Sequence, residues 1–290
     1  MRTIVALPNL LTLANAFCGL LAISKGIDAL AMGGAEPALF YAKMEAACWL
    51  IFLGMVFDAL DGRVARMTGG ASAFGRQLDS LSDALTFGIA PPLLAKGLIE
   101  YEGPIRGYAG DARLHFLAAA AFALMAILRL ARFNLETEPS AESHKYFRGL
   151  PSPAAAGTVA STILFYLVMH YPELETVEGT KTPLGRALAL FDNPQIAVPS
   201  WSLTALALLL PCLGFLMVSR VRYPHMVAVL TRRGTFFTLV YMVFGAFLFF
   251  AAPIPMLFLT AHTFVISGVV RSLARRRRPA VHAPESVRRS

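Results

Sequence analysis

The sequence predicts an all-α integral membrane protein, a polytopic bundle of about eight transmembrane helices. Hydrophobic residues make up 56% of its 290 positions and charged residues only 15%, whereas about a quarter of a soluble domain is charged. Apolar runs of roughly 17 to 25 residues, the length that crosses a bilayer as a helix, recur along the whole chain. Charged residues gather at the ends of these runs, where a membrane protein meets water.

The apolar runs place the spans, and prolines shape two of them. The Pro91-Pro92 pair falls inside the third run and is expected to kink or interrupt it, because proline removes a helix donor and crowds the preceding turn. Pro253 and Pro255 separate the last two runs, which favours a tight helical hairpin there. The predicted spans are 8–25, 44–66, 76–99, 113–135, 151–170, 200–218, 235–251 and 255–271.

The distribution of basic residues predicts the orientation of the bundle in the membrane. An even number of spans puts both termini on one side, together with the loops at 67–75, 136–150 and 219–234. That side holds 19 of the 26 lysine and arginine residues, so by the positive-inside rule it is cytoplasmic. We expect residues 1–271 to form one domain in the cytoplasmic (inner) cell membrane, and residues 272–290 to form a basic, disordered cytoplasmic tail.

The formal net charge of +8 raises the question of a nucleic-acid partner. A nucleic-acid-binding protein presents a basic face on a polar scaffold. Here the excess arginines lie in the tail and at span ends, which is typical of a membrane rim facing anionic lipid headgroups. The bilayer, and no nucleic acid, is therefore the expected partner.

Four aspartates interrupt or border the second and third spans: Asp58, Asp61, Asp79 and Asp83. A carboxylate in or near the hydrocarbon region is destabilising unless it is paired or bound to metal. Asp58 and Asp61 are spaced i,i+3 and Asp79 and Asp83 i,i+4, so each pair shares a helix face. An antiparallel pairing of the two helices would bring all four carboxylates together, as an oxygen cage for a hard divalent cation.

Spacing alone leaves two further roles open for these aspartates. The first is a structural salt-bridge cluster with the neighbouring Arg63, Arg66 and Arg76. The second is an ion or proton pathway, because carboxylates inside a membrane also mark transporters. A transporter, however, should spread its charges along a path through several spans, whereas these acids gather on two adjacent helices.

The longer pattern around the aspartates is more specific. Residues 58–83 read DALDGRVARMTGGASAFGRQLDSLSD, which is D-x2-D-G-x2-A-R-x8-G-x3-D-x3-D without a departure. This segment resembles the eight-position signature of the CDP-alcohol phosphatidyltransferase family. The resemblance implies that family's fold, a homodimer, and transfer of a phosphatidyl group from a CDP-activated lipid to an alcohol, with release of CMP.

The resemblance also implies roles for individual residues. Asp58, Asp61, Asp79 and Asp83 would hold divalent metal, two Mg²⁺ or Mn²⁺ ions, and Asp83 would also be the catalytic general base on the acceptor hydroxyl. Two cations could bind the pyrophosphate and neutralise charge during an in-line displacement. The residues expected at the CDP group are Gly62, Ala65, Arg66 and Gly75.

Other segments point to serine as the acceptor. The opening LPNLLTLANAFCGLLAI, the continuation DSLSDALTFGIAPPLL, RLARFN at 129–134 and GLPSPAAAG at 149–157 resemble the branch of the family that makes phosphatidylserine. The substrates implied are CDP-diacylglycerol and L-serine. Glycerol phosphate, inositol phosphate or choline stays open as the acceptor, and a cation transporter as the rival class.

A serine substrate brings its own carboxylate to a site already rich in negative charge, so a cationic partner is expected, preferably one able to bind bidentately. Arginines at helix ends also anchor spans in the membrane, so both roles stay open for each arginine. The candidates for acceptor binding are Arg129, Arg132, Asn134 and Arg148.

Overall fold

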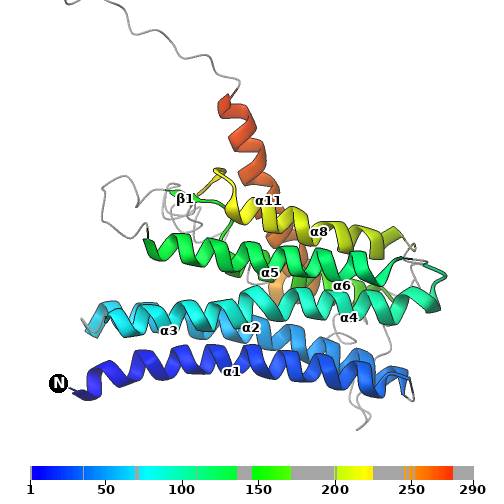
Figure 1. The fold of residues 1–290 in the computed structure, drawn as a ribbon, viewed down its shortest axis with the longest axis horizontal. Coiled ribbons are helices and arrows are strands. Elements are labelled where there is room, and N and C mark those ends of the chain that lie inside the picture. The colour runs from blue at the N-terminus through cyan, green and yellow to red at the C-terminus, as the bar shows by residue number, and fades with distance from the viewer. Residues whose placement is uncertain are drawn as a thin grey trace, which may run out of the picture.

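A computed structural model describes residues 2–34, 36–68, 72–108, 110–135, 146–170, 199, 201–224, 245, 248–250 and 252–276. In this part of the chain long helices form a bundle, with one short pair of strands at one end (Figure 1). The elements are α1 (Arg2–Met32), α2 (Pro37–Thr68), α3 (Ala73–Asp83), the π-helix η1 (Ala84–Ile89), α4 (Ala90–Ile105), α5 (Ala112–Leu135), β1 (Tyr146–Arg148), α6 (Ser152–His170), α8 (Trp201–Val218), β2 (Arg222–Pro224) and α11 (Pro253–Arg276). The predicted all-α polytopic class is confirmed.

The first two helices form a long hairpin and pack along one another (Figure 1). α2 has 32 residues. At a rise of about 1.5 Å per residue its length exceeds the thickness of the hydrocarbon core, roughly 30 Å. Asp58 lies about 32 Å along the axis from Pro37 by the same rise. A helix that starts at one membrane surface at Pro37 therefore reaches the opposite surface where its aspartates begin.

The third predicted span is one composite helix, α3–η1–α4. Ser72 caps its start, because the Gly75 N–H donates to Ser72 Oγ at 2.9 Å. Pro91 and Pro92 occupy the first turn of α4, and the π-helix lies immediately before them. The Ala90 N–H bonds the Leu85 carbonyl five residues back, so the helix widens just before the two residues that have no N–H to donate. The predicted interruption is confirmed, and it takes the form of a π-helical turn.

Small residues let α1, α2 and η1 cross closely. A Cβ on Gly19 would lie 2.5 Å from Thr86 Oγ1, and a Cβ on Gly54 would lie 2.6 Å from Thr86 Cγ2. The Thr86 hydroxyl donates to the main-chain carbonyl of Asn15 at 2.8 Å. Small residues at helix contacts are how membrane helices approach closely enough to gain packing and hydrogen bonds. The contact fixes α1 beside the start of α4.

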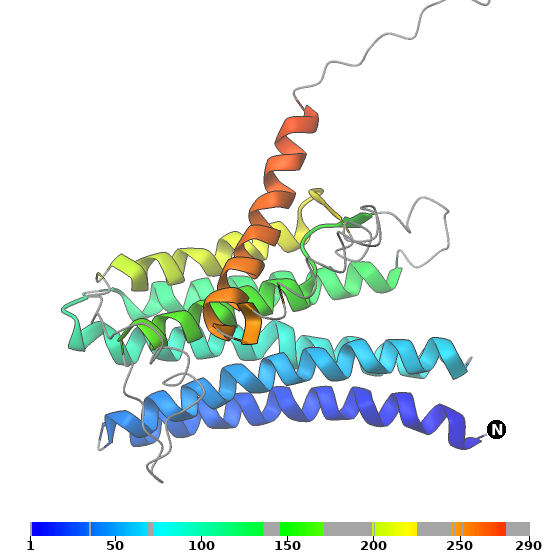
Figure 2. The same ribbon diagram turned by 180° about the vertical axis from the view of Figure 1, so that it is seen from behind.

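The remaining described helices pack around these. α5 packs along α8, and α6 lies between these helices and α2 (Figures 1 and 2). In an 18-residue stretch of α6 72% of the residues are buried, against 17% in α11, so α6 is central and α11 peripheral. α11 packs against α6 but crosses it at a steep angle, and its second half projects beyond the bundle (Figure 2).

Six of the described helices are long and apolar enough to cross a membrane: α1, α2, α5, α6, α8 and α11. They match six of the eight predicted spans. The composite α3–η1–α4 covers a seventh, predicted at 76–99. Most of the span predicted at 235–251 lies outside the described residues, as does its hairpin with α11. α11 begins at Pro253, where the sequence placed the break.

The two strands join loops far apart in the sequence. β1 and β2 pair antiparallel, with Phe147 opposite Tyr223. Gly149 follows β1 with a φ of +83°, and a Cβ there would collide with the Met217 carbonyl, so glycine fits this turn. The loops predicted at 136–150 and 219–234 therefore meet at one end of the bundle, as alternating spans require.

Candidate functional site: an aspartate cluster between α2 and α3

Three carboxylates converge where α2 lies beside α3. One carboxylate oxygen from each of Asp58, Asp61 and Asp79 lies within 4.8 Å of the others. Asp83, one turn beyond Asp79, is close enough to Asp58 and Asp79 for Coulombic repulsion. These four residues are called the aspartate cluster below. The predicted convergence of the two helix faces is therefore observed.

The cluster is unevenly buried. Asp61 is 5% exposed and Asp83 9%, whereas Asp58 and Asp79 are half-buried. Buried carboxylates that repel one another need compensation. The ion pairs found among the described residues, Lys43–Asp28, Lys96–Glu100 and Arg106–Glu102, involve none of the four. Pairing with Arg63, Arg66 or Arg76 does not occur in this part of the chain, which disfavours a structural salt-bridge role for the cluster.

One oxygen of the cluster is conspicuous for lacking a partner. Asp79 Oδ1 is buried and finds no hydrogen-bond donor among the described residues. A buried polar atom of this kind is rare in a native protein unless an ion or water satisfies it. An all-oxygen, all-carboxylate set is also the donor chemistry that magnesium and manganese prefer. The cluster therefore fits a divalent metal ion.

Helix α1 supplies two polar contacts to the cluster that the sequence patterns did not predict. The Thr12 hydroxyl lies 2.7 Å from Asp61 Oδ2, and the Asn15 side-chain amide donates to Asp83 Oδ1 at 3.2 Å. Asn15 is fully buried and Thr12 is 4% exposed. A signal was present in the sequence, because Asn9, Thr12 and Asn15 stand three residues apart within residues 4–23 of α1, which are otherwise apolar.

The four residues predicted to bind the CDP group lie around the cluster. Gly62, Ala65 and Arg66 continue the α2 face that carries Asp58, and a Cβ on Gly62 would lie 3.6 Å from Arg66 Nη1. The exposed Arg66 guanidinium therefore lies near a bare patch of helix backbone. Gly75 lies in the first turn of α3, where its Cβ would meet Asn9 Oδ1 at 3.2 Å.

Two of the four predicted acceptor residues are brought to the cluster. Arg129 of α5 interacts electrostatically with both Asp58 and Asp83, and it donates to Ser152 Oγ at 2.6 Å. Asn134 exchanges hydrogen bonds of 2.9 and 3.1 Å with Ser80, which lies between Asp79 and Asp83 on α3. These contacts place one cation and one amide at the edge of the cluster.

The other two acceptor candidates are less defined. Arg132 is half-buried on α5, one turn beyond Arg129. Arg148 ends β1, where its backbone pairs with that of Arg222, but its side chain lies outside the described residues. Of the predicted arginines, Arg129 is the one whose interaction with the aspartates can be described.

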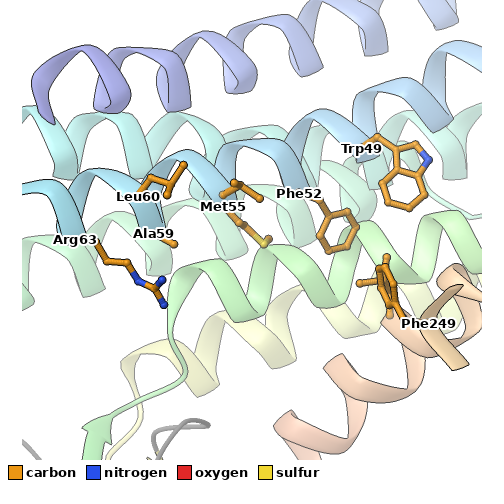
Figure 3. A pocket seen from close by; sticks show the side chains of 9 residues that line it. Trp49, Phe52, Met55, Ala59, Leu60, Arg63 and Phe249 are labelled. Carbon is orange, nitrogen blue, oxygen red and sulfur yellow. The ribbon is translucent and has the colours of Figure 1, made fainter. Parts of the chain in front are cut away.

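An apolar groove of about 490 Å³ runs along a neighbouring face of α2 (Figure 3). Arg63 marks one end and Trp49 the other, with Phe249 across from Phe52 (Figure 3). The groove therefore ends in a cation at the part of α2 that carries the aspartates. Its lining comprises Trp49, Phe52, Met55, Val56, Ala59, Leu60, Arg63, Phe249 and Leu257.

The fold and the cluster together define an integral membrane protein with an acidic site suited to a divalent cation. The profile of the CDP-alcohol phosphatidyltransferase family matches residues 5–191, a segment that contains the whole cluster. The chain therefore belongs to the CDP-alcohol phosphatidyltransferase family. The resemblance read from residues 58–83 is confirmed.

The chain is also similar to individual named enzymes. The chain is 31% identical over 269 residues to a CDP-diacylglycerol–serine O-phosphatidyltransferase of Helicobacter pylori, covering 92% of this chain and 90% of that one. It is 34% identical over 220 residues to the enzyme of the same name from Bacillus subtilis, with coverages of 76% and 90%. An archaetidylserine synthase of Methanothermobacter thermautotrophicus is 40% identical over 173 residues, with coverages of 59% and 61%.

Proposed function

We propose that this protein transfers the phosphatidyl group of CDP-diacylglycerol to the hydroxyl of L-serine, giving phosphatidylserine and CMP. The observation that carries the proposal is the convergence of three carboxylates within 4.8 Å, with Arg129 acting on the same cluster, in a member of this family. A transporter is disfavoured, because the acids of the cluster belong to two adjacent helices rather than to a path through several spans.

The relatives support serine more strongly than they support the lipid. All three are named for making a serine phospholipid, although one is an archaetidylserine synthase and two are named for CDP-diacylglycerol. The Helicobacter enzyme aligns over nearly the whole of both chains. CDP-diacylglycerol is therefore the lipid we assign.

The aspartate cluster would hold the divalent metal. Asp58, Asp61 and Asp79 offer converging oxygens, and Asp83 adds a fourth carboxylate, enough for two Mg²⁺ or Mn²⁺ ions. When bound, such ions neutralise the charge of the pyrophosphate and of the departing nucleotide. Asp79 Oδ1, which lacks a partner among the described residues, is the atom with the clearest need of a cation.

Asp83 is assigned as the general base. The serine hydroxyl oxygen attacks the lipid-bearing phosphorus, and Asp83 takes the hydroxyl proton. The bond from that phosphorus to the bridging oxygen breaks, and CMP leaves with the electron pair. Only 9% of Asp83 is exposed, so water has little access to the base. Limited access matters because attack by water would destroy the activated lipid.

The nucleotide would lie beside α2 and the start of α3. Gly62 and Ala65 leave the α2 backbone open, and the exposed Arg66 is placed to donate to a phosphate of the CDP group. Gly75 leaves similar clearance where α3 begins. On α2 the residues assigned to the nucleotide thus follow the carboxylates along one helix face.

Arg129 is assigned to the serine carboxylate. Its guanidinium has further donors beyond the one used for Ser152, because arginine carries five N–H groups. Asn134, held against Ser80, borders the same space, and Arg132 and Arg148 complete the proposed acceptor set. A cation here offsets the repulsion between the substrate carboxylate and the aspartates.

The apolar groove along α2 suits one acyl chain of the lipid substrate. Its walls are aliphatic and aromatic, and it ends at Arg63 near the aspartates. A lipid that enters the groove laterally from the bilayer would therefore have its headgroup directed toward the cluster. We place the cluster and both termini on the cytoplasmic side and residues 1–271 in the membrane domain. Of the basic tail predicted at 272–290, residues 272–276 are helical, because α11 continues to Arg276, and the rest lies outside the described residues. We also propose a homodimer.

The test uses purified protein in detergent with CDP-diacylglycerol, Mn²⁺ or Mg²⁺, and a panel of labelled alcohols. We expect metal-dependent CMP release and labelled lipid with serine alone. Product from glycerol phosphate, inositol phosphate or choline instead would preserve the chemistry but overturn the assignment of serine. Failure to release CMP with any acceptor would overturn the enzymatic proposal.

A further inference from the structure

We propose that α1 is part of the catalytic apparatus, with Thr12 and Asn15 acting as positioning residues for Asp61 and Asp83. The inference rests on the roles proposed above for the aspartates. α1 contributes no carboxylate to the cluster. Its contribution is a neutral hydrogen-bond donor to each of the two most buried aspartates.

The contacts divide the cluster into two pairs. Asp61 and Asp83, at 5% and 9% exposure, each have an α1 donor, at 2.7 and 3.2 Å. The Thr12 hydroxyl also lies 3.0 Å from the carbonyl of Pro8 on its own helix, so the contact with Asp61 is the shorter of its two. Among the described residues no hydrogen bond is found to the side chains of the half-buried Asp58 and Asp79. The inner pair is therefore held by protein groups, and the outer pair keeps its oxygens for ligands.

The orientation of the Asn15 side chain follows from its surroundings. Its Oδ1 is buried without a donor among the described residues and faces the α2 backbone at Gly54, where a Cβ would lie 3.0 Å away. Turning the amide over would set Oδ1 against Asp83 Oδ1, two acceptors facing each other. The amide nitrogen must therefore point at the carboxylate.

The backbone of α1 is fixed at the same place. The Asn15 carbonyl accepts the hydroxyl of Thr86, and Gly19 and Gly54 allow η1 to lie against both helices. The backbone at Asn15 is therefore held against the same composite helix that carries Asp83, which fixes the amide relative to the carboxylate. An error of about 1 Å in the position of a catalytic group lowers the rate severely, so rigidity here has a kinetic consequence.

Neutral donors suit a metal site better than cations. A lysine or arginine bonded to Asp61 would supply the positive charge that the metal ion is meant to supply, and would weaken metal binding. A hydroxyl or amide orients the carboxylate and leaves its charge available. Groups of this kind behind metal ligands alter metal affinity or activity by about 10- to 100-fold when removed.

The experiment compares isosteric variants that differ by one donor. Thr12→Val removes the hydroxyl and Thr12→Ser keeps it, and Asn15→Leu removes the amide at similar volume. Thr158→Val is the matched control, because Thr158 is also buried and, like Thr12, bonds the carbonyl four residues back on its own helix, but among the described residues its hydroxyl bonds no other helix. Each is measured for kcat, for KM of both substrates, for thermal unfolding, and for Mn²⁺ binding by the electron paramagnetic resonance of free Mn²⁺ with CMP present.

We expect Thr12→Val to weaken Mn²⁺ binding by about tenfold or more and Thr12→Ser to restore it. Asn15→Leu should lower kcat by about tenfold or more with each KM within about threefold, and Thr158→Val should match the wild type. If Asn15→Leu does not fold, Asn15→Ala removes the same donor without adding bulk. The inference is overturned if folded variants bind Mn²⁺ and turn over like the wild type.

The Mn²⁺ measurement separates this inference from the proposed function. If the wild type makes no product from serine, the proposed function fails. The difference in Mn²⁺ affinity between Thr12→Val and Thr12→Ser would still stand or fall by itself. If both Thr12 variants lose only thermal stability, with metal affinity and kcat intact, α1 is a structural support and no more.

Discussion

The composite helix α3–η1–α4 carries buried carboxylates near both ends, and the two ends are built differently. About 28 Å separates Asp83 from Glu102 along the helix, from the usual rise per residue. Glu102 is fully buried, yet both its oxygens are used: Tyr41 donates to Oε1 at 2.7 Å, and Tyr166 and Arg106 to Oε2 at 3.0 and 2.6 Å. The aspartate cluster has four carboxylates, and none of them forms an ion pair among the described residues.

This difference between the two ends distinguishes a carboxylate with a structural role from carboxylates with a chemical role. A buried carboxylate that is fully hydrogen-bonded and paired with an arginine needs nothing more, and it fastens α2, α4 and α6 together. A buried group of carboxylates in which one oxygen has no donor among the described residues is suited to binding a cation. Changes at the Glu102 end should therefore alter stability, and changes in the aspartate cluster should alter activity.

The strongest test of this contrast is Asp83→Asn. Replacing the carboxylate by an amide preserves the size of the side chain but removes the base, so kcat should fall by about 10²- to 10⁴-fold. The unfolding temperature should stay the same or rise, because one of several mutually repelling charges disappears. CMP release and thermal unfolding in the same detergent check both points. A variant that unfolds at a lower temperature and keeps its kcat would contradict the contrast.

The reciprocal change is Glu102→Ala. Alanine removes one partner of a buried ion pair together with the acceptor of two tyrosine hydroxyls, and the free energy of unfolding should fall by about 3–5 kcal/mol. The kcat of the remaining folded protein should stay within about threefold of wild type, because the site lies at the other end of the helix. Glu102→Gln, which keeps the volume and one acceptor, is the milder control. A specific loss of kcat would show that this end takes part in the chemistry.

Metal removal should also distinguish the two ends. At a concentration 100 times its dissociation constant, Mn²⁺ should stabilise the wild type by about 2.7 kcal/mol relative to chelated protein. Asp58→Asn should lose most of this stabilisation, and Glu102→Gln should retain it. Chelator-dependent unfolding curves for the three proteins give the answer. Equal stabilisation of all three would mean that the metal binds elsewhere.

A smaller effect is expected from Arg129→Lys. Lysine keeps the charge but loses the planar fork that binds a carboxylate bidentately. The KM for serine should rise by about tenfold, roughly the 1.4 kcal/mol of one strong contact, while the KM for CDP-diacylglycerol changes little. Arg113→Lys, an exposed position at the far end of α5, is the matched control. Equal serine KM values for the two variants would remove Arg129 from the acceptor site.

The smallest predicted change is Tyr41→Phe. It deletes the hydrogen bond from the Tyr41 hydroxyl to Glu102 and leaves the ion pair with Arg106, so the loss should be about 1 kcal/mol of unfolding free energy. Serine and lipid kinetics should match the wild type. Denaturant or thermal unfolding resolves the shift, and a loss as large as that of Glu102→Ala would show that Tyr41 supports more than one bond.

Residues 58–83 show which features of the site can be predicted from the sequence pattern. Spacing of three and four residues puts Asp58 with Asp61, and Asp79 with Asp83, on single helix faces, and helix geometry then makes their convergence predictable. The kink at Pro91 was predictable for a similar reason, because proline acts on its own helix. What these features share is that each depends on residues within about one helical turn, or on one short loop.

The sequence by itself determined the membrane class, most of the spans, the family and the acidic motif, because hydrophobic length and helical spacing are local properties. Only the tertiary structure decided that Thr12 and Asn15 support the cluster, that Arg129 reaches it, and that Glu102 accepts hydrogen bonds from Tyr41 and Tyr166, whereas its ion pair with Arg106 is a local i,i+4 contact. Apart from that ion pair, each of those contacts joins helices far apart in the chain. A polar residue in an apolar run needs a partner, but which partner it finds depends on how the helices cross.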